Sequence, residues 1–129
     1  MRSAAEPQAA LGGKRILVVE DELMIRMLLE DMLAELGCTI AAQAGHLDEA
    51  LETARNGEFD IAILDVNLGG QPILPVADAL AARGLPFVFA TGYGERGLPD
   101  SYRERPTLKK PFELDSLRRT LESTLAAKQ

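Results

Sequence analysis

Three short apolar runs constrain the fold of this 129-residue chain more than any other feature. They cover residues 15–20, 60–65 and 86–91, and none of them alternates apolar with polar positions along its length. A strand with one solvated face would alternate, so these runs predict strands that are buried on both faces. Such strands occur mainly in parallel sheets with helices on both sides.

Amphipathic segments lie between these runs. The first predicted helix covers residues 22–36 and ends before Gly37, a residue typical of helix C-termini. Its apolar positions recur at helical spacing and are Leu23, Met24, Met27, Leu28, Met32 and Leu36. The remaining pattern predicts strands at 38–43 and 106–108 and helices at 47–56, 73–83 and 114–125.

The segment from residue 92 to 106 breaks the alternation. It contains three glycines and two prolines, including Pro99, and has poor periodicity, so we expect a short or missing fourth helix. Strands alternating with helices predict an α/β fold with right-handed crossovers. We therefore predict a doubly wound five-stranded parallel sheet of (βα)5, flavodoxin-like topology with strand order 2-1-3-4-5.

Length and composition bound the function. The length suits one domain, which we place at residues 14–129 after a flexible tail at residues 1–13 that lacks the apolar stretch of a signal peptide or membrane span. The net charge of -6 argues against nucleic-acid binding. Cys38 is the only cysteine, which excludes an internal disulfide and favours a cytoplasmic protein.

Polar residues stand where the predicted strands end. These are Glu20, Asp21, Asp65, Thr91 and Lys110. The carboxyl ends of parallel strands meet at one rim, which is where ligands bind in such sheets. Three crowded carboxylates repel one another unless a proton or a cation intervenes, and Mg²⁺ suits this oxygen-rich set. Such an ion could place a phosphoryl group against a carboxylate, and Asp65 is the nucleophile we expect.

Four motifs at these positions resemble those of the response-regulator receiver family of two-component systems. They are Val-Val-Glu20-Asp21-Glu22, Ile-Leu-Asp65-Val-Asn67-Leu, Phe-Ala-Thr91-Gly92 and Lys109-Lys110-Pro111-Phe112. The resemblance implies that Asp65 is the phosphoacceptor. It also implies that Asp21, Glu20, Asp65 and the backbone carbonyl of Asn67 hold the metal, and that Thr91 and Lys110 bind phosphoryl oxygens.

One position departs from this family. An aromatic switch residue is usual three positions before the lysine, and Thr107 stands there. Tyr93, two residues beyond Thr91, is the alternative switch candidate, although its ring could equally pack over the loop.

A narrower resemblance concerns the run Pro-Phe-Val-Phe-Ala-Thr-Gly-Tyr at residues 86–93, which is similar to that of FATGUY receivers. This resemblance implies a single-domain regulator phosphorylated by a sensor histidine kinase of the HWE or HisKA-2 type. It further implies that the chain signals to a downstream protein through a conformational change, or acts as a phosphate sink. It implies no enzyme activity beyond the chain's own phosphorylation and dephosphorylation.

Three other functions compete with this interpretation. A nucleotide-binding sheet would need a glycine loop where Glu20, Asp21 and Glu22 stand. A dehalogenase-type phosphatase would usually have a second acid two residues after its nucleophile, where Asn67 stands. A receiver-shaped interaction module that is never phosphorylated would not need all five polar residues at the rim.

Overall fold

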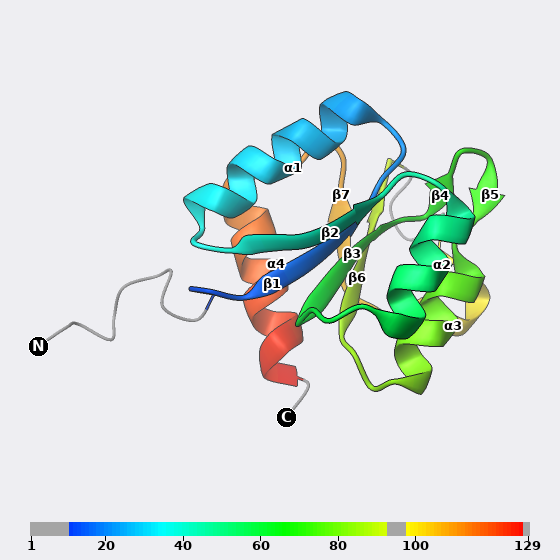
Figure 1. Ribbon diagram of the computed structural model, residues 1–129. Helices are drawn as coiled ribbons and strands as arrows, with labels where there is room; N and C mark the ends of the chain where they lie inside the picture. Colours follow the sequence, from blue (N-terminus) through cyan, green and yellow to red (C-terminus); the bar gives the residue numbers. More distant parts are fainter. Residues whose placement is uncertain (1–10, 93–97, 128–129) are drawn as a thin grey trace, which may run out of the picture.

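The computed structural model describes residues 11–92 and 98–127 of the chain. Its centre is a five-stranded parallel sheet in the order β2-β1-β3-β6-β7 (Figure 1). These strands are β1 (Arg15–Val19), β2 (Thr39–Ala44), β3 (Ile61–Asp65), β6 (Phe87–Thr91) and β7 (Thr107–Lys109). Counted within this sheet, the order is the predicted 2-1-3-4-5, so the doubly wound fold is confirmed.

Helices cover both faces of the sheet. Helices α1 (Leu23–Glu35) and α4 (Leu114–Ala127) lie on one face, and α2 (Leu47–Asn56) and α3 (Leu74–Ala82) lie on the other (Figure 1). Each pair of helices encloses a separate hydrophobic core with the sheet. The fold thus has three layers, helices on either side of one sheet.

The two cores explain why the strand sequences do not alternate. In β1, Leu17 and Val19 belong to the core beneath α2 and α3, whereas Ile16 and Val18 belong to the core beneath α1 and α4. Side chains of successive strand residues point to opposite faces. Because both faces are covered, every position of a central strand needs an apolar side chain.

The domain begins earlier than the sequence predicts. Leu11 is fully buried in the core beneath α1 and α4, and the amide of Gly13 donates a hydrogen bond of 2.9 Å to the carbonyl of Gly37. Residues 11–13 are therefore part of the domain and not of the tail. The apolar side chain of Leu11 fixes this boundary, because it gains free energy on leaving water. The rest of the predicted tail lies outside the described residues.

Helix α1 is apolar on two sides. Leu29 and Leu33 on the helix, with Leu36 just beyond it, are its core residues. Most of the apolar series that predicts the helix is exposed, namely Leu23, Met24, Met27 and Leu28. Met24 is 82% exposed, which is unusual for a large apolar side chain.

Two connections matter for the rim of the sheet. The first is an unpredicted antiparallel hairpin of β4 (Asn67–Leu68) and β5 (Gln71–Pro72), whose turn residues Gly69 and Gly70 have φ of +58° and +85°. Glycine adopts these positive φ values without steric penalty. The second is the segment before β7, whose described residues 98–106 contain a short 3₁₀ helix, η3 (Asp100–Tyr102), and no longer helix. Residues 93–97 lie outside the described part.

Candidate functional site

The topology of the sheet brings the predicted polar residues to one rim. Glu20 and Asp21 follow β1, Asp65 ends β3, Thr91 ends β6 and Lys110 follows β7. The register of the central strands places Val19 opposite Leu64, so the next residues, Glu20 and Asp65, lie at the same level. Strand order, rather than proximity in sequence, therefore assembles this site.

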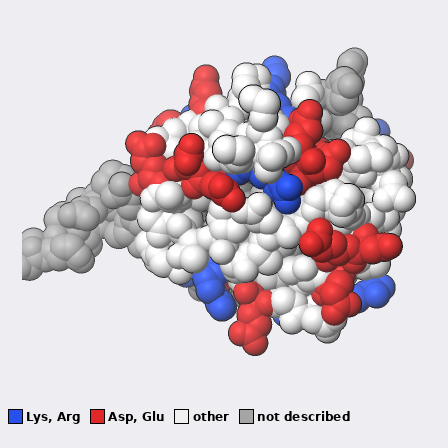
Figure 2. Space-filling model, turned by 45° about the horizontal axis from the view of Figure 1, so that its top comes forward, with Lys and Arg blue, Asp and Glu red and all other residues white. Residues whose placement is uncertain are grey.

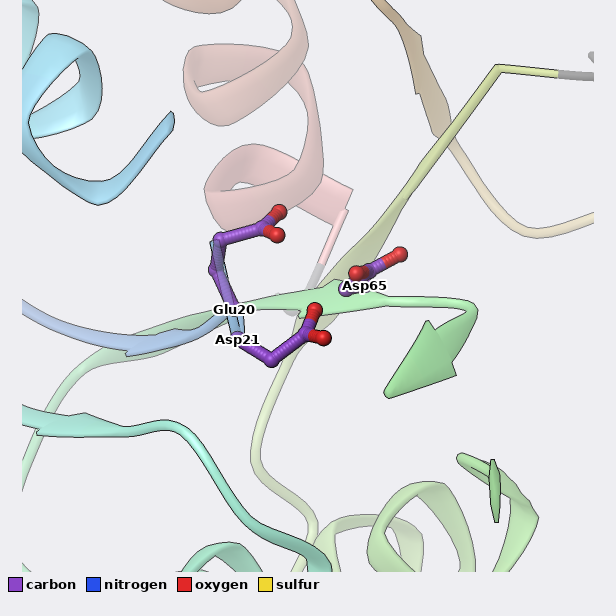
Figure 3. Close-up of side chains that lie close together, drawn as sticks. All are labelled: Glu20, Asp21 and Asp65. Atoms are coloured by element: carbon purple, nitrogen blue, oxygen red, sulfur yellow. The ribbon is translucent and has the colours of Figure 1, made fainter. Parts of the chain in front are cut away.

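Three carboxylates form a compact cluster at this rim. Glu20, Asp21 and Asp65 each offer an oxygen that lies within 4.8 Å of the others, and Figure 3 shows their side chains gathered beyond the ends of β1 and β3. Glu20 is 1% exposed and Asp65 is 7% exposed, whereas Asp21 faces solvent. The cluster is thus a half-buried concentration of negative charge that reaches solvent at Asp21.

Lys110 neutralises part of this charge. Its Nζ lies 3.0 Å from Oε1 of Glu20 and 3.6 Å from Oδ1 of Asp65. Burial lowers the pKa of Lys110, but the hydrogen bond with Glu20 and the charge of Asp65 outweigh burial, so the pKa is raised overall. Lys110 therefore stays protonated at neutral pH and holds a positive charge next to Asp65. The peptide bond from Lys110 to Pro111 is cis.

Asp65 is the carboxyl group most affected by this environment. Burial, followed by the negative charge of Glu20, raises its pKa to about 7. Lys110 and the backbone amide of Asn67, which donates to Oδ1 at 3.3 Å, act in the opposite direction. The surroundings of Asp65 therefore disfavour its ionised form. A cation bound beside it would favour that form by supplying positive charge.

The oxygen donors at the rim suit a hard cation. Two buried carboxylates and an exposed carboxylate are ligands typical of Mg²⁺, which keeps several waters. The glycine turn of the hairpin lies beside the cluster, because a Cβ atom added to Gly69 would be in ordinary van der Waals contact, 3.8 Å, with Oδ2 of Asp21. Sequence reasoning missed this hairpin, although the pair of glycines after Asn67 was a signal for it.

The remaining predicted residues are placed differently. Thr91 is buried at the end of β6, and its carbonyl accepts a hydrogen bond of 3.0 Å from the amide of Lys110. The hydroxyl of Thr107 donates to the carbonyl of Arg105 at 3.1 Å, so Thr107 satisfies its own local backbone. Tyr93, the other switch candidate, lies outside the described residues.

Charge on the molecular surface is divided rather than uniform. On the face shown in Figure 2, acidic side chains form several separate groups, and basic side chains lie between two of them. The excess of acids agrees with the net charge of -6. Among residues 11–92 and 98–127, no helix is long and apolar enough to cross a lipid bilayer.

Comparison with known proteins decides the family. A family model described as the response regulator receiver domain matches residues 16–122, which span β1 to most of α4. The chain belongs to the response regulator receiver domain family. The predicted family is thereby confirmed. The rim described above is the edge of the receiver-domain sheet at which the strands have their carboxyl ends.

Several relatives resemble this receiver domain. The solution structure of SdrG from Sphingomonas melonis Fr1 is 46% identical with a TM-score of 0.78 and covers 91% of this chain and 98% of its own. The receiver domain of the PhyR response regulator from Erythrobacter litoralis is 33% identical with a TM-score of 0.75, covering 91% and 93%. The transcriptional regulatory protein PdtaR from Mycobacterium tuberculosis is 34% identical over 108 residues, or 81% of this chain and 53% of PdtaR. The chain spans about half the length of the curated relatives it matches first.

Proposed function

We propose that this receiver domain accepts a phosphoryl group on Asp65 from a sensor histidine kinase. The observation that carries the proposal is a mostly buried carboxylate at a strand end, 3.6 Å from a lysine ammonium and clustered with two other acids. In the reaction, an oxygen of Asp65 attacks phosphorus while the bond from phosphorus to the donor imidazole breaks. The electron pair of that bond leaves with the imidazole nitrogen.

The same proposal assigns a magnesium site to the acid cluster. Glu20, Asp21, Asp65 and the backbone carbonyl of Asn67 would hold the ion, with Glu20 acting either directly or through a water. When bound, Mg²⁺ supplies charge neutralisation and a template for phosphoryl oxygens. Glu20 and Asp65 are both buried, and Lys110 is the cation that the structure places against them, so a divalent ion would balance the negative charge that remains.

Lys110 and Thr91 would bind the transferred group. Lys110 already lies within ion-pair distance of Asp65, so its ammonium can neutralise a phosphoryl oxygen with little movement. Thr91 ends the strand next to β3, and its hydroxyl would donate a hydrogen bond to a second oxygen. Both groups stabilise charge that is present on the phosphoryl group as it passes between nitrogen and oxygen.

Helix α1 offers the surface that a protein donor needs. The phosphorylated histidine has to approach the exposed side of the acid cluster, and α1 begins immediately after Asp21 and Glu22. The exposed apolar side chains of its first two turns, Leu23, Met24, Met27 and Leu28, flank that approach. We propose that they form the kinase-binding surface, because large apolar side chains exposed three and four residues apart on one helix are typical of a protein interface.

The subtype and the output are also part of the proposal. The motif at residues 86–93 supports a single-domain regulator of the FATGUY type, with a kinase of the HWE or HisKA-2 type. The domain would catalyse only its own phosphorylation and dephosphorylation, and would either change conformation to bind a downstream protein or serve as a phosphate sink. The 46% identity with SdrG supports a close functional relationship with that protein.

The decisive experiment measures phosphorylation directly. Purified chain is incubated with acetyl phosphate or phosphoramidate, with Mg²⁺ or with EDTA, and separated on a Phos-tag gel. We expect a Mg²⁺-dependent shift that Asp65→Asn abolishes. The matched control is Asp60→Asn, because Asp60 lies just before the opposite end of the same strand. A shift that survives in Asp65→Asn, or no shift with either donor or with any kinase, would contradict the proposal.

A further inference from the structure

Tyr102, in the connection between β6 and β7, packs against the sheet. It is the last residue of η3, and its ring centroid lies 5.5 Å from that of Phe87 and 5.9 Å from that of Phe89. Phe87 and Phe89 are fully buried and contact each other edge to face. Aromatic contacts with these tilted geometries are attractive, so the ring anchors η3 on β6.

The strand beneath Tyr102 is the one that ends in the phosphorylation site. Side chains of alternate residues project from the same face of a strand, so Phe87, Phe89 and Thr91 share one face of β6. Phe87 and Phe89 belong to the core beneath α2 and α3, which identifies that face. Tyr102 therefore packs against Phe89, which is two positions before Thr91. The Phe89 and Thr91 side chains project from the same face of β6.

A hydrogen bond holds the other end of Tyr102. Its hydroxyl donates to Oδ1 of Asp78 on α3 at 2.6 Å. Burial and this hydrogen bond raise the pKa of Tyr102, so the hydroxyl keeps its proton at neutral pH. The guanidinium of Arg105 lies 4.4 Å from the Phe87 ring centroid and 5.5 Å from that of Tyr102. One side chain thus joins η3, β6 and α3.

We infer that Tyr102, held by Asp78, is a positioning residue that couples the β6–β7 connection to the Asp65 site through β6. The inference rests on the proposed function. A phosphoryl group on Asp65 draws the Thr91 hydroxyl toward it, and the displacement passes along β6 to Phe89 and then to the Tyr102 ring. Because a close-packed core does not deform continuously, the ring and its hydrogen bond adopt a second arrangement.

Thermodynamic linkage means that this coupling can be measured either at the Tyr102–Asp78 hydrogen bond or as ligand affinity at the Asp65 site. If occupation of the Asp65 site changes the strength of the hydrogen bond between Tyr102 and Asp78, removal of that bond changes ligand affinity by the same factor. The bond is exposed, so we expect a factor near the low end of allosteric couplings, about fivefold. A residue with a purely structural role would alter stability and leave this affinity unchanged.

Beryllofluoride with Mg²⁺, a phosphoryl analogue, is the probe, and 3-fluorotyrosine is the reporter. The chain has two tyrosines, so labelled protein gives two ¹⁹F signals, which Tyr102→Phe assigns. We expect the Tyr102 signal to move when beryllofluoride binds. Amide spectra of residues next to Asp65 report binding itself. A Tyr102 signal that stays fixed while those amides shift would overturn the inference and leave the proposed function standing.

A double-mutant cycle then tests the hydrogen bond. Tyr102→Phe removes only the hydroxyl, and Asp78→Ala removes its acceptor. We expect each to change the apparent Kd for beryllofluoride about fivefold in the same direction, and the double variant to change it no further. Asp100→Ala is the control, since it breaks only the exposed ion pair with Arg103 in the same connection. Wild-type affinity in both single variants would overturn the coupling, and no beryllofluoride binding by the wild type would overturn the proposed function with it.

Discussion

Asp65 links the chemistry of the rim to the stability of the domain. Its pKa of about 7 exceeds the value near 4 expected in an unfolded chain. Between about pH 4 and pH 7 the native chain therefore holds more protons at this residue than the unfolded chain does. The contribution of Asp65 to the free energy of unfolding is present at low pH and is lost as pH rises through this window.

The first prediction follows for the metal-free domain. In EDTA at pH 8, Asp65→Asn should raise the free energy of unfolding by about 1–3 kcal/mol, because the amide needs no compensating charge. At pH 4 the two proteins should differ little. Urea unfolding from pH 4 to pH 8 measures the difference, with Asp60→Asn as control. A stability difference that does not grow as pH rises would show that Asp65 ionises freely in the native domain.

The second prediction concerns Asp21, the exposed carboxylate of the acid cluster and a proposed Mg²⁺ ligand. Asp21→Ala should weaken Mg²⁺ binding at least about tenfold, because it removes a carboxylate from the open side of the cluster. Glu22→Ala is the matched control, since Glu22 is the adjacent exposed acid and lies outside the cluster. Calorimetric titration at pH 8 gives both affinities. Equal losses in the two variants would reduce the role of Asp21 to general electrostatic attraction.

At the scale of elements, the unusual helix is α1, because it exposes an apolar surface as well as burying one. The third prediction is that Met24→Gln with Met27→Gln slows phosphotransfer from a cognate histidine kinase about tenfold, the effect of losing a little over 1 kcal/mol of interface energy. Labelling by acetyl phosphate should be unchanged, because this small donor needs no protein surface.

Ala82→Gln provides the control for this prediction, since it adds the same side chain at an exposed position of α3 on the other face of the sheet. Time courses with both donors should be compared on the same gels. Equal slowing with both donors would instead indicate damage to the Asp65 site, and no slowing with the kinase would remove α1 from the interface.

The strands and the rim of the sheet could be predicted from the sequence, whereas the buried face of α1 could not. The buried strands were predictable because covering both faces of a sheet requires continuous apolar runs. The site was predictable in outline because parallel strands bring their carboxyl ends together, which places Glu20, Asp65 and Lys110 at one rim. The buried side of α1 was not predictable, because its apolar residues extend around more than one face and periodicity cannot say which face packs.

Other features depended on contacts between distant residues. The boundary at Leu11 reflects a core position formed by tertiary packing, and no local pattern marks it. The role of Tyr102 depends on Phe87, Phe89 and Asp78, which come together only when α3 and β6 are packed. The resemblance to the receiver family instead indicates Thr107 and Tyr93, which lie close in sequence to Lys110 and Thr91.

At the scale of the whole molecule, the two cores differ in how they are closed. Helices and sheet enclose both, but the core beneath α1 and α4 also includes Leu11 from the segment before β1. The backbone carbonyl of Leu11 lies 3.6 Å from the thiol of Cys38, which is buried. Burial raises the pKa of this thiol, so little reactive thiolate forms while the segment is in place.

The fourth prediction is that the rate at which Cys38, the single thiol, reacts with a reagent reports how often the domain opens. Leu11→Ala should speed the reaction of Cys38 with an aromatic disulfide reagent about tenfold or more, because removing a buried leucine side chain favours the open form by about 2 kcal/mol or more. Leu23→Ala, at an exposed position, should leave the rate unchanged. If the two variants react equally fast, Cys38 is reached by another route. Labelling rates, followed by absorbance, would then report how often this edge of the domain opens under native conditions, with no denaturant.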